Sequence, residues 1–169
     1  TWGADVVAVA ANGNAKTTQA GSIFADRKLD VELVREDVLS KQLENYLSCK
    51  SPFARGTMDM ISQMATVANK NPKTKMRVLM QLSWSAGADM LVVGANIKKP
   101  SDLRNKTIAL QLNGPHSYYL AKVLADAGLS LKDVKLKYTK DLTGTDQTPT
   151  AAMQSGSVDA AMVISPDAG

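Results

Sequence analysis

Residues 107–128, TIALQLNGPHSYYLAKVLADAG, carry the clearest structural signals in the chain. Their first five residues form a short apolar run, which is typical of a buried strand. In the loop that follows, Asn113 or Gly114 can cap a helix, a proline suits the first helical turn, and a glycine suits the helix end. We therefore predict a strand over residues 107–111 and a helix over residues 115–127.

The same alternation of strand and helix signals recurs along the chain. Further strands are expected at residues 3–11, 30–34, 76–84, 89–93, 134–138 and 158–164, and further helices at 15–27, 39–47, 60–68, 101–104 and 150–154. Alternating elements of this kind imply parallel sheets with helices on both faces. The pattern breaks at residues 94–100 and then restarts, which predicts an α/β fold with two such sheets.

Composition and charge exclude several classes of protein. The 169 residues are 44% hydrophobic and 21% charged, which is ordinary for a globular chain. The net charge of +4 is spread evenly, and only eight residues are aromatic. A nucleic-acid-binding surface would instead need clustered basic residues with aromatic stacking partners. We therefore expect no nucleic-acid partner.

Cysteine and histidine are too few for a metal or disulfide framework. With Cys49 and His116 as the single members of their types, neither an internal disulfide nor a Cys/His zinc site can form. We find no nucleophile elbow, phosphate-binding loop or dinucleotide fingerprint, so we expect no cofactor and no catalytic residue. No run approaches a membrane span, and Thr1 is not preceded by a leader, so we expect a mature, trimmed or incomplete chain.

Ligands of open α/β sheets bind beyond the carboxyl ends of strands, where loops lead into helices. Three loops qualify: residues 12–14, 85–89 and 113–117. The third is the leading candidate, because free amides at a helix start favour an anion and Ser117 adds a hydroxyl donor. A carboxylate, sulfonate or phosphate would suit it. The alternative is that this loop only caps a helix.

Other polar and aromatic residues have both a structural and a functional interpretation. His116 is a ligand contact or a packed residue, and catalysis together with its neighbour Ser117 is disfavoured because adjacent helical residues point about 100° apart. Trp84 is an aromatic wall for a ligand or part of the core. Asp89 and Asp167 are ligand or hinge residues, or solvated carboxylates. The predicted ligand-binding residues are Asn12, Trp84, Ser85, Asp89, Asn113, His116, Ser117 and Asp167. Asp59 is interpreted as a capping or surface acid.

Three motifs in the second half resemble type II periplasmic solute-binding proteins of ABC transporters. Residues 100–109 (PSDLRNKTIA) are similar to the family's "dLkGKkiAv" segment, residues 114–120 (GPHSYYL) to its helix start, and residues 155–161 (SGSVDAA) to its "sG.vDA" strand. The branch is that of nitrate, sulfonate and thiamine-precursor binding. Asn105 replaces the family glycine, and asparagine tolerates the left-handed conformation next best.

The resemblance also covers the first half and the chain's end. Residues 29–33 and 56–59 are similar to the family's "gldVel" and "G.iD" positions. Residues 141–145 and 165–168 resemble a subgroup associated with phosphate uptake, sometimes fused to a peptidoglycan-binding domain. The resemblance implies a two-lobed fold in an incomplete fragment. Lobe 1 would span residues 1–94 without its C-terminal return, lobe 2 residues 95–165, and residues 166–169 would begin the crossover back.

The function implied by the resemblance is capture of a small polar or anionic solute in the cleft between lobes by hinge closure. The linkers at residues 94–98 and 165–167 would absorb the rotation. The implied partners are the solute, an ABC transporter permease and, through a further C-terminal region, peptidoglycan or another envelope component. The implied location is the periplasm or cell envelope. Two alternatives stay open: an envelope scaffold with a repurposed fold, or an enzyme on the same fold, related to pyrimidine-precursor synthase or menaquinone-pathway enzymes.

Overall fold

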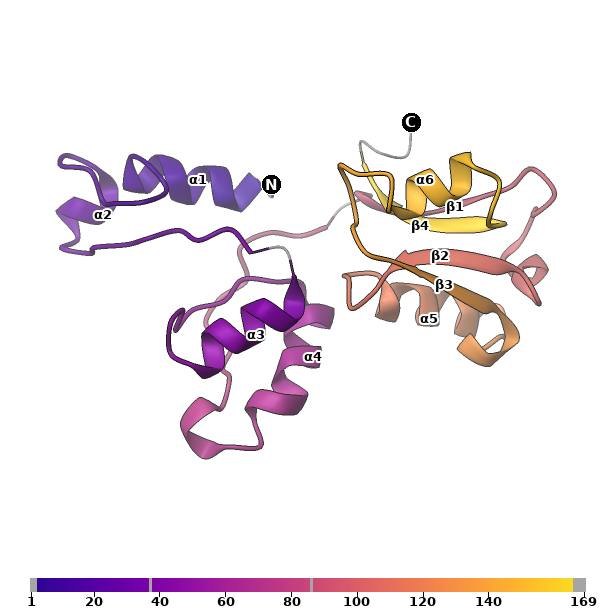
Figure 1. The fold of residues 1–169 in the computed structure, drawn as a ribbon, viewed down its shortest axis with the longest axis horizontal. Helices are drawn as coiled ribbons and strands as arrows, with labels where there is room; N and C mark the ends of the chain where they lie inside the picture. The colour runs from indigo at the N-terminus through magenta and orange to yellow at the C-terminus, as the bar shows by residue number, and fades with distance from the viewer. Residues whose placement is uncertain (1–2, 37, 86, 166–169) are drawn as a thin grey trace.

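The computed structural model describes residues 3–36, 38–85 and 87–165. Four α-helices come first along the described chain, and all four described strands come after residue 88 (Figure 1). The elements in chain order are α1 (Gly3–Asn12), α2 (Ile23–Asp26), α3 (Leu39–Leu47), α4 (Met58–Ala68), η1 (Pro72–Thr74), β1 (Asp89–Val93), η2 (Pro100–Leu103), β2 (Thr107–Gln111), α5 (Ser117–Asp126), η3 (Leu131–Asp133), β3 (Lys135–Thr139), α6 (Pro149–Gln154) and β4 (Ala160–Ile164).

The four strands form one mostly parallel sheet in the order β1-β4-β2-β3. β2 is parallel to both β3 and β4, whereas β1 is antiparallel to β4, with Asp89 opposite Ile164. Alternate side chains of β2 and β4 point to opposite faces. On one face Leu120 and Leu124 of α5 join the core, and on the other Ala152 of α6 packs against the strands. The predicted α/β class, with helices flanking a parallel-rich sheet, is confirmed. The second predicted sheet does not form among the described residues, because those before Asp89 contribute no strand.

The predicted elements after residue 88 agree with the structure, with shifts at their ends. β1 to β4 correspond to the four strands expected there, and α6 and η2 to the two short helices. α5 begins at Ser117, two residues later than predicted. Its N-cap residue is His116, without a side-chain capping bond, so the predicted cap by Asn113 or Gly114 is wrong. Gly128, at φ +71°, ends the helix region in the left-handed conformation, as predicted.

The first predicted strand, over residues 3–11, is instead the helix α1. A nine-residue apolar run cannot by its pattern alone distinguish a buried strand from a helix, and its alanines favour the helix. The run is also not buried along its length, because Val6 and Val7 are 60% and 68% exposed. Since none of the described strands lies beside it, the backbone satisfies its hydrogen bonds within the helix.

The predicted helix over residues 15–27 is reduced to α2, and the predicted strand over residues 30–34 does not form. Thr18 explains both corrections, because its hydroxyl accepts a hydrogen bond from the Val31 amide at 2.8 Å and donates one to Asn12. Gly21 also takes a left-handed φ of +78°. Side-chain bonds of this kind compete with a regular backbone ladder.

The predicted strand over residues 76–84 is also wrong, since these residues pair with no described strand. Its large apolar side chains are exposed, among them Leu79 at 74% and Trp84 at 84%. By contrast, α3 and α4 form at the predicted places, and Met64 and Ala68 of α4 are buried. The pattern of residues 76–84 is typical of a strand, but a strand requires a partner to complete its hydrogen bonds.

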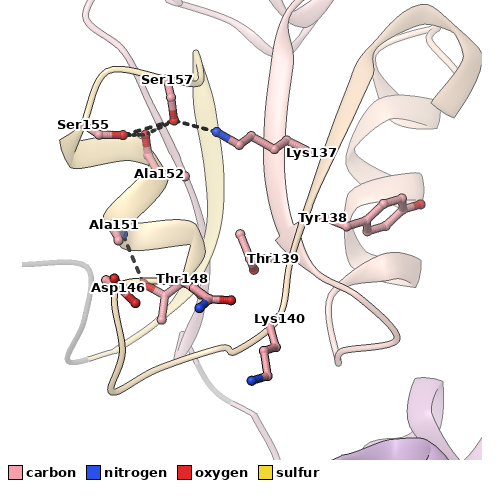
Figure 2. A pocket seen from close by; sticks show the side chains of 11 residues that line it. Lys137, Tyr138, Thr139, Lys140, Asp146, Thr148, Ala151, Ala152, Ser155 and Ser157 are labelled. Atoms are coloured by element: carbon pink, nitrogen blue, oxygen red, sulfur yellow. Dashed lines mark hydrogen bonds between the residues drawn. The ribbon is translucent and has the colours of Figure 1, made fainter.

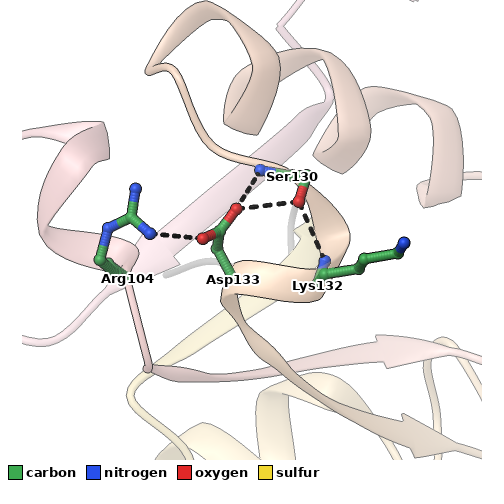
Figure 3. A network of polar contacts seen from close by, with 4 residues as sticks. All are labelled: Arg104, Ser130, Lys132 and Asp133. Atoms are coloured by element: carbon green, nitrogen blue, oxygen red, sulfur yellow. Dashed lines mark hydrogen bonds and ion pairs between the residues drawn. The ribbon is translucent and has the colours of Figure 1, made fainter.

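A capping network fixes the turn that leads from α5 into β3 (Figure 3). The Asp133 carboxylate accepts hydrogen bonds from the Ser130 amide and hydroxyl, both at 2.8 Å, and pairs with the Arg104 guanidinium. The Asn105 amide donates to the Asp133 carbonyl at 2.7 Å. The Ser130 hydrogen bonds, with the Arg104 charge beside them, hold the pKa of Asp133 below its ordinary 3.8.

We predict that this network contributes stability that disappears in acid. Because the folded state lowers the pKa of Asp133, the contribution is present above the unfolded-state pKa and is lost as the pH falls below about 4, through the lowered folded-state value. In urea unfolding, Asp133→Asn should therefore lower stability at pH 7 and flatten its decline in acid. The surface variant Asp146→Asn is the control, and an equal acid slope in wild type and Asp133→Asn would contradict the prediction.

Candidate functional site

The sheet's topology gathers several chain segments at one edge. Because β2, β3 and β4 run parallel, their carboxyl ends share this edge, and the antiparallel β1 brings its first residue, Asp89, to the same place. The loops after β2 and β3 leave from here and are joined by a hydrogen bond from the Leu112 amide to the Thr139 carbonyl, 2.9 Å. We call this region the carboxyl edge: residue 89 and loops 112–117 and 140–148.

Three of the predicted site residues meet at the carboxyl edge. The His116 Nε2 lies 2.8 Å from Asp89 Oδ1, and the Ser85 hydroxyl donates to Asp89 Oδ2. We assign the hydrogen of the His116–Asp89 bond to Nε2, because a carboxylate only accepts. The imidazole is 1% exposed. The pair therefore joins the beginning of β1 to the residue that precedes α5.

The other ring nitrogen of His116 is unusual for a buried polar atom. Among the described residues, His116 Nδ1 is the only buried side-chain nitrogen or oxygen that lacks a hydrogen-bond partner. Leaving such an atom unsatisfied costs about 1–3 kcal/mol. His116 is therefore buried, as its interpretation as a packed residue expects, and it has unused hydrogen-bonding capacity at Nδ1.

The α5 N-terminus already holds a carboxylate. The Tyr118 amide, in the first turn of α5, donates to Asp59 Oδ2 at 3.1 Å. Asp59 comes from the first turn of α4, 59 residues earlier in the chain. Free amides and the positive end of the helix dipole favour a negative charge there. Asp59 was interpreted from the sequence as a capping or surface acid, and its role at α5 was missed because no local pattern signals it.

The remaining predicted site residues take no part in the hydrogen bonds that join Ser85, Asp89 and His116. Asn12 is fully buried and donates to the carbonyls of Asn14 and Val31, at 2.9 and 2.8 Å, so it holds the loop after α1. Trp84 is 84% exposed and therefore not part of the core. Asn113 is exposed, with a left-handed φ of +55°. Asp167 lies outside the described residues.

A groove that the sequence did not predict lies between β3 and α6 (Figure 2). Its volume is about 470 Å³, and its lining includes Lys137, Lys140, Thr148 and Ser157. The Lys137 ammonium points to Ser157 and donates to its hydroxyl at 2.9 Å. The sequence predicts only a strand over residues 134–138, and the hydroxyls that α6 brings opposite it come from a separate part of the chain, so no local pattern signals the groove.

No group of three or more acidic, histidine or cysteine side chains in the described part of the chain is placed to hold a metal ion. None of the described helices combines the length and apolar character that a membrane crossing requires.

Comparison with known proteins places the chain in a family. The family model described as "NMT1/THI5 like" matches residues 17–167, so the chain belongs to the NMT1/THI5-like family. This confirms the resemblance to type II periplasmic solute-binding proteins. Comparison with curated proteins finds no match.

Solved structures similar to the chain include sulfonate-binding proteins. The periplasmic aliphatic sulphonate binding protein SsuA of Escherichia coli is 30% identical over 48% of this chain and 25% of its own, with a TM-score of 0.41. The alkanesulfonate-binding SsuA of Xanthomonas axonopodis pv. citri, bound to MOPS, is 29% identical over 47% of this chain and 27% of its own, with a TM-score of 0.42. The chain thus spans about a quarter of each.

One further solved structure covers more of this chain and is similar to it in fold alone. A protein of Bordetella bronchiseptica RB50 is 22% identical over 85% of this chain and 44% of its own, with a TM-score of 0.51.

We predict that the Asp89–His116 pair stabilises the carboxyl edge. Asp89→Ala should lower the free energy of unfolding by about 1–3 kcal/mol, because it leaves the buried Nε2–H of His116 without an acceptor. Asp89→Asn keeps an acceptor oxygen and should cost less. Urea unfolding at pH 7 measures both, and an Asp89→Ala variant as stable as wild type would contradict the pairing.

Proposed function

We propose that the chain is the solute-binding part of an ABC-type uptake system and captures a small anion at the carboxyl edge. The observation that carries the proposal is the carboxylate of Asp59 on the Tyr118 amide, because it demonstrates that an anionic oxygen fits the α5 N-terminus. Membership in the NMT1/THI5-like family supports a solute-binding role. A carboxylate, sulfonate or phosphate group has the required charge and acceptor oxygens.

The donors and surfaces around this helix start suit an organic anion. Ser117, the first residue of α5, is partly exposed, and its hydroxyl makes no hydrogen bond with the described residues. The side chains of Leu112 and Tyr118, on either side of the loop, are 54% and 71% exposed. They offer apolar surface to the body of a solute whose acidic group lies on the helix amides. The sulfonate ligands of the similar SsuA proteins have this character.

The geometry of the polar residues favours binding over catalysis. In a hydrolytic triad the histidine stands between the nucleophile and the carboxylate, so that it can accept the nucleophile's proton. Here the Asp89 carboxylate stands between Ser85 and His116, and both donate to it. Ser85 therefore has a carboxylate partner in place of an imidazole base. This arrangement supports a binding protein rather than an enzyme on the same fold.

The proposal includes a location and a mechanism for the whole protein. We propose that it works in the periplasm or cell envelope and delivers its solute to a permease, as its family implies. Capture would use closure of two lobes on the solute, because the closed form alone makes both sets of contacts. β1, which the predicted boundary at residue 94 assigned to lobe 1, pairs with β4, so we place the lobe connection before Asp89.

A thermal-shift and calorimetric titration with ethanesulfonate, acetate and phosphate tests the proposal. A solute present at a concentration of about a hundred times its dissociation constant should raise the free energy of unfolding by about 2.7 kcal/mol. Ser117→Ala should weaken binding by about tenfold, because a hydrogen bond to a charged group is lost. Ser101→Ala, an exposed serine outside the carboxyl edge, should bind like wild type. No stabilisation by any of the three anions would contradict the proposal.

A further inference from the structure

Asp59 is held in its position on α5 by its own helix. It lies in the first turn of α4, whose N-cap Thr57 accepts a hydrogen bond from the Met60 amide at 3.3 Å. Its Oδ1 accepts from the Gln63 side-chain amide at 3.3 Å, which leaves Oδ2 for the Tyr118 amide. The carboxylate thus lies at the positive ends of two helices, and both favour its negative charge.

The contact joins two parts of the chain that no pairing of the described strands connects. The described residues before Asp89 contribute no strand to the sheet, and Asp59 reaches α5 across 59 residues of sequence. A carboxylate that is part of the same chain competes within the molecule, at an effective concentration that the connection sets and that dilution of the protein does not change. A free anion that binds the same amide must therefore displace a competitor that cannot diffuse away.

We propose that Asp59 is an internal anion, which occupies the solute's position on α5 in the empty protein. A solute must displace Asp59 in order to bind, and this lowers the protein's apparent affinity for the solute. The proposal rests on the proposed function, since it assigns the solute's acidic group to the Tyr118 amide. Solute binding would release Asp59 and with it the contact between α4 and α5. The apparent affinity is then lower than the intrinsic one by the fraction of molecules in which Asp59 is released.

Removing the carboxylate should therefore strengthen anion binding. Asp59→Ala should lower the dissociation constant for ethanesulfonate by about tenfold, the order of effect of one charged group at a helix start. Asp59→Asn, which keeps the shape of the side chain and loses its charge, should lower it by a smaller factor. Asp126→Asn removes the same charge at the other end of α5, where Asp126 pairs with Lys122, and should leave the constant within about twofold of wild type.

The outcomes of this titration separate the two proposals. If wild type and Asp59→Ala bind ethanesulfonate, acetate and phosphate with equal affinity, the internal competition is wrong and the proposed function stands. If Asp59→Ala binds more weakly, Asp59 is a solute contact and the internal competition is again wrong. Absence of binding to either protein overturns both proposals.

Amide hydrogen exchange at Tyr118 gives a second readout that does not depend on affinity. In the empty protein, Asp59→Ala should exchange this amide faster than wild type because its acceptor is gone, and saturating ethanesulfonate should restore protection. Equal exchange in the two empty proteins would contradict the proposal. Circular dichroism of both variants verifies that α4 and α5 are intact.

Discussion

The pairing of β4 with β1 on one side and β2 on the other is the constraint on which the carboxyl edge depends. β4 is parallel to β2 and antiparallel to β1, so the end of β4 lies beside the beginning of β1. Asp89 is placed opposite Ile164 and within reach of His116. If β1 paired in any other register or direction, the Asp89–His116 bond and the loop conformation before α5 would be lost.

Packing of α5 against the sheet holds the amides of its first turn at the carboxyl edge. Leu120 and Leu124 are fully buried against the sheet, and burial of each leucine contributes about 1.5–3 kcal/mol. The helix axis is therefore fixed relative to the strands, with its first turn at the carboxyl edge. Amides held in this way need little reorganisation when an anion arrives, which is the general advantage of a helix start over surface lysines.

Sequence patterns predicted the sheet region because local and long-range forces agree there. The apolar run at residues 107–111, the left-handed Gly128 and Asn105 at φ +64° all take the expected conformations. Residues 3–36 have equally apolar runs, but α1 forms by local propensity and the Thr18 hydroxyl takes bonds that a strand would need. Pattern analysis cannot detect the absence of partner strands.

The candidate site was predictable only in its local parts. His116 and Ser117 follow from the rule that loops after parallel strands carry ligands. Ser85 and Asp89 were predicted by the same rule, but the strand expected before them does not form and Asp89 begins the antiparallel β1. Asp59 could not be found this way, since its role depends on an approach of α4 to α5 across 59 residues. The groove between β3 and α6 was missed for the same reason, as its two walls come from separate elements.

A two-dimensional NMR titration with ethanesulfonate locates the anion site on the protein, because it follows the backbone amides of all parts of the chain at once. The largest shift changes should fall in residues 112–119, with smaller changes around Asp59. Saturable changes centred on the β3–α6 groove or on residues 3–36, with the α5 N-terminus unperturbed, would contradict the proposed site.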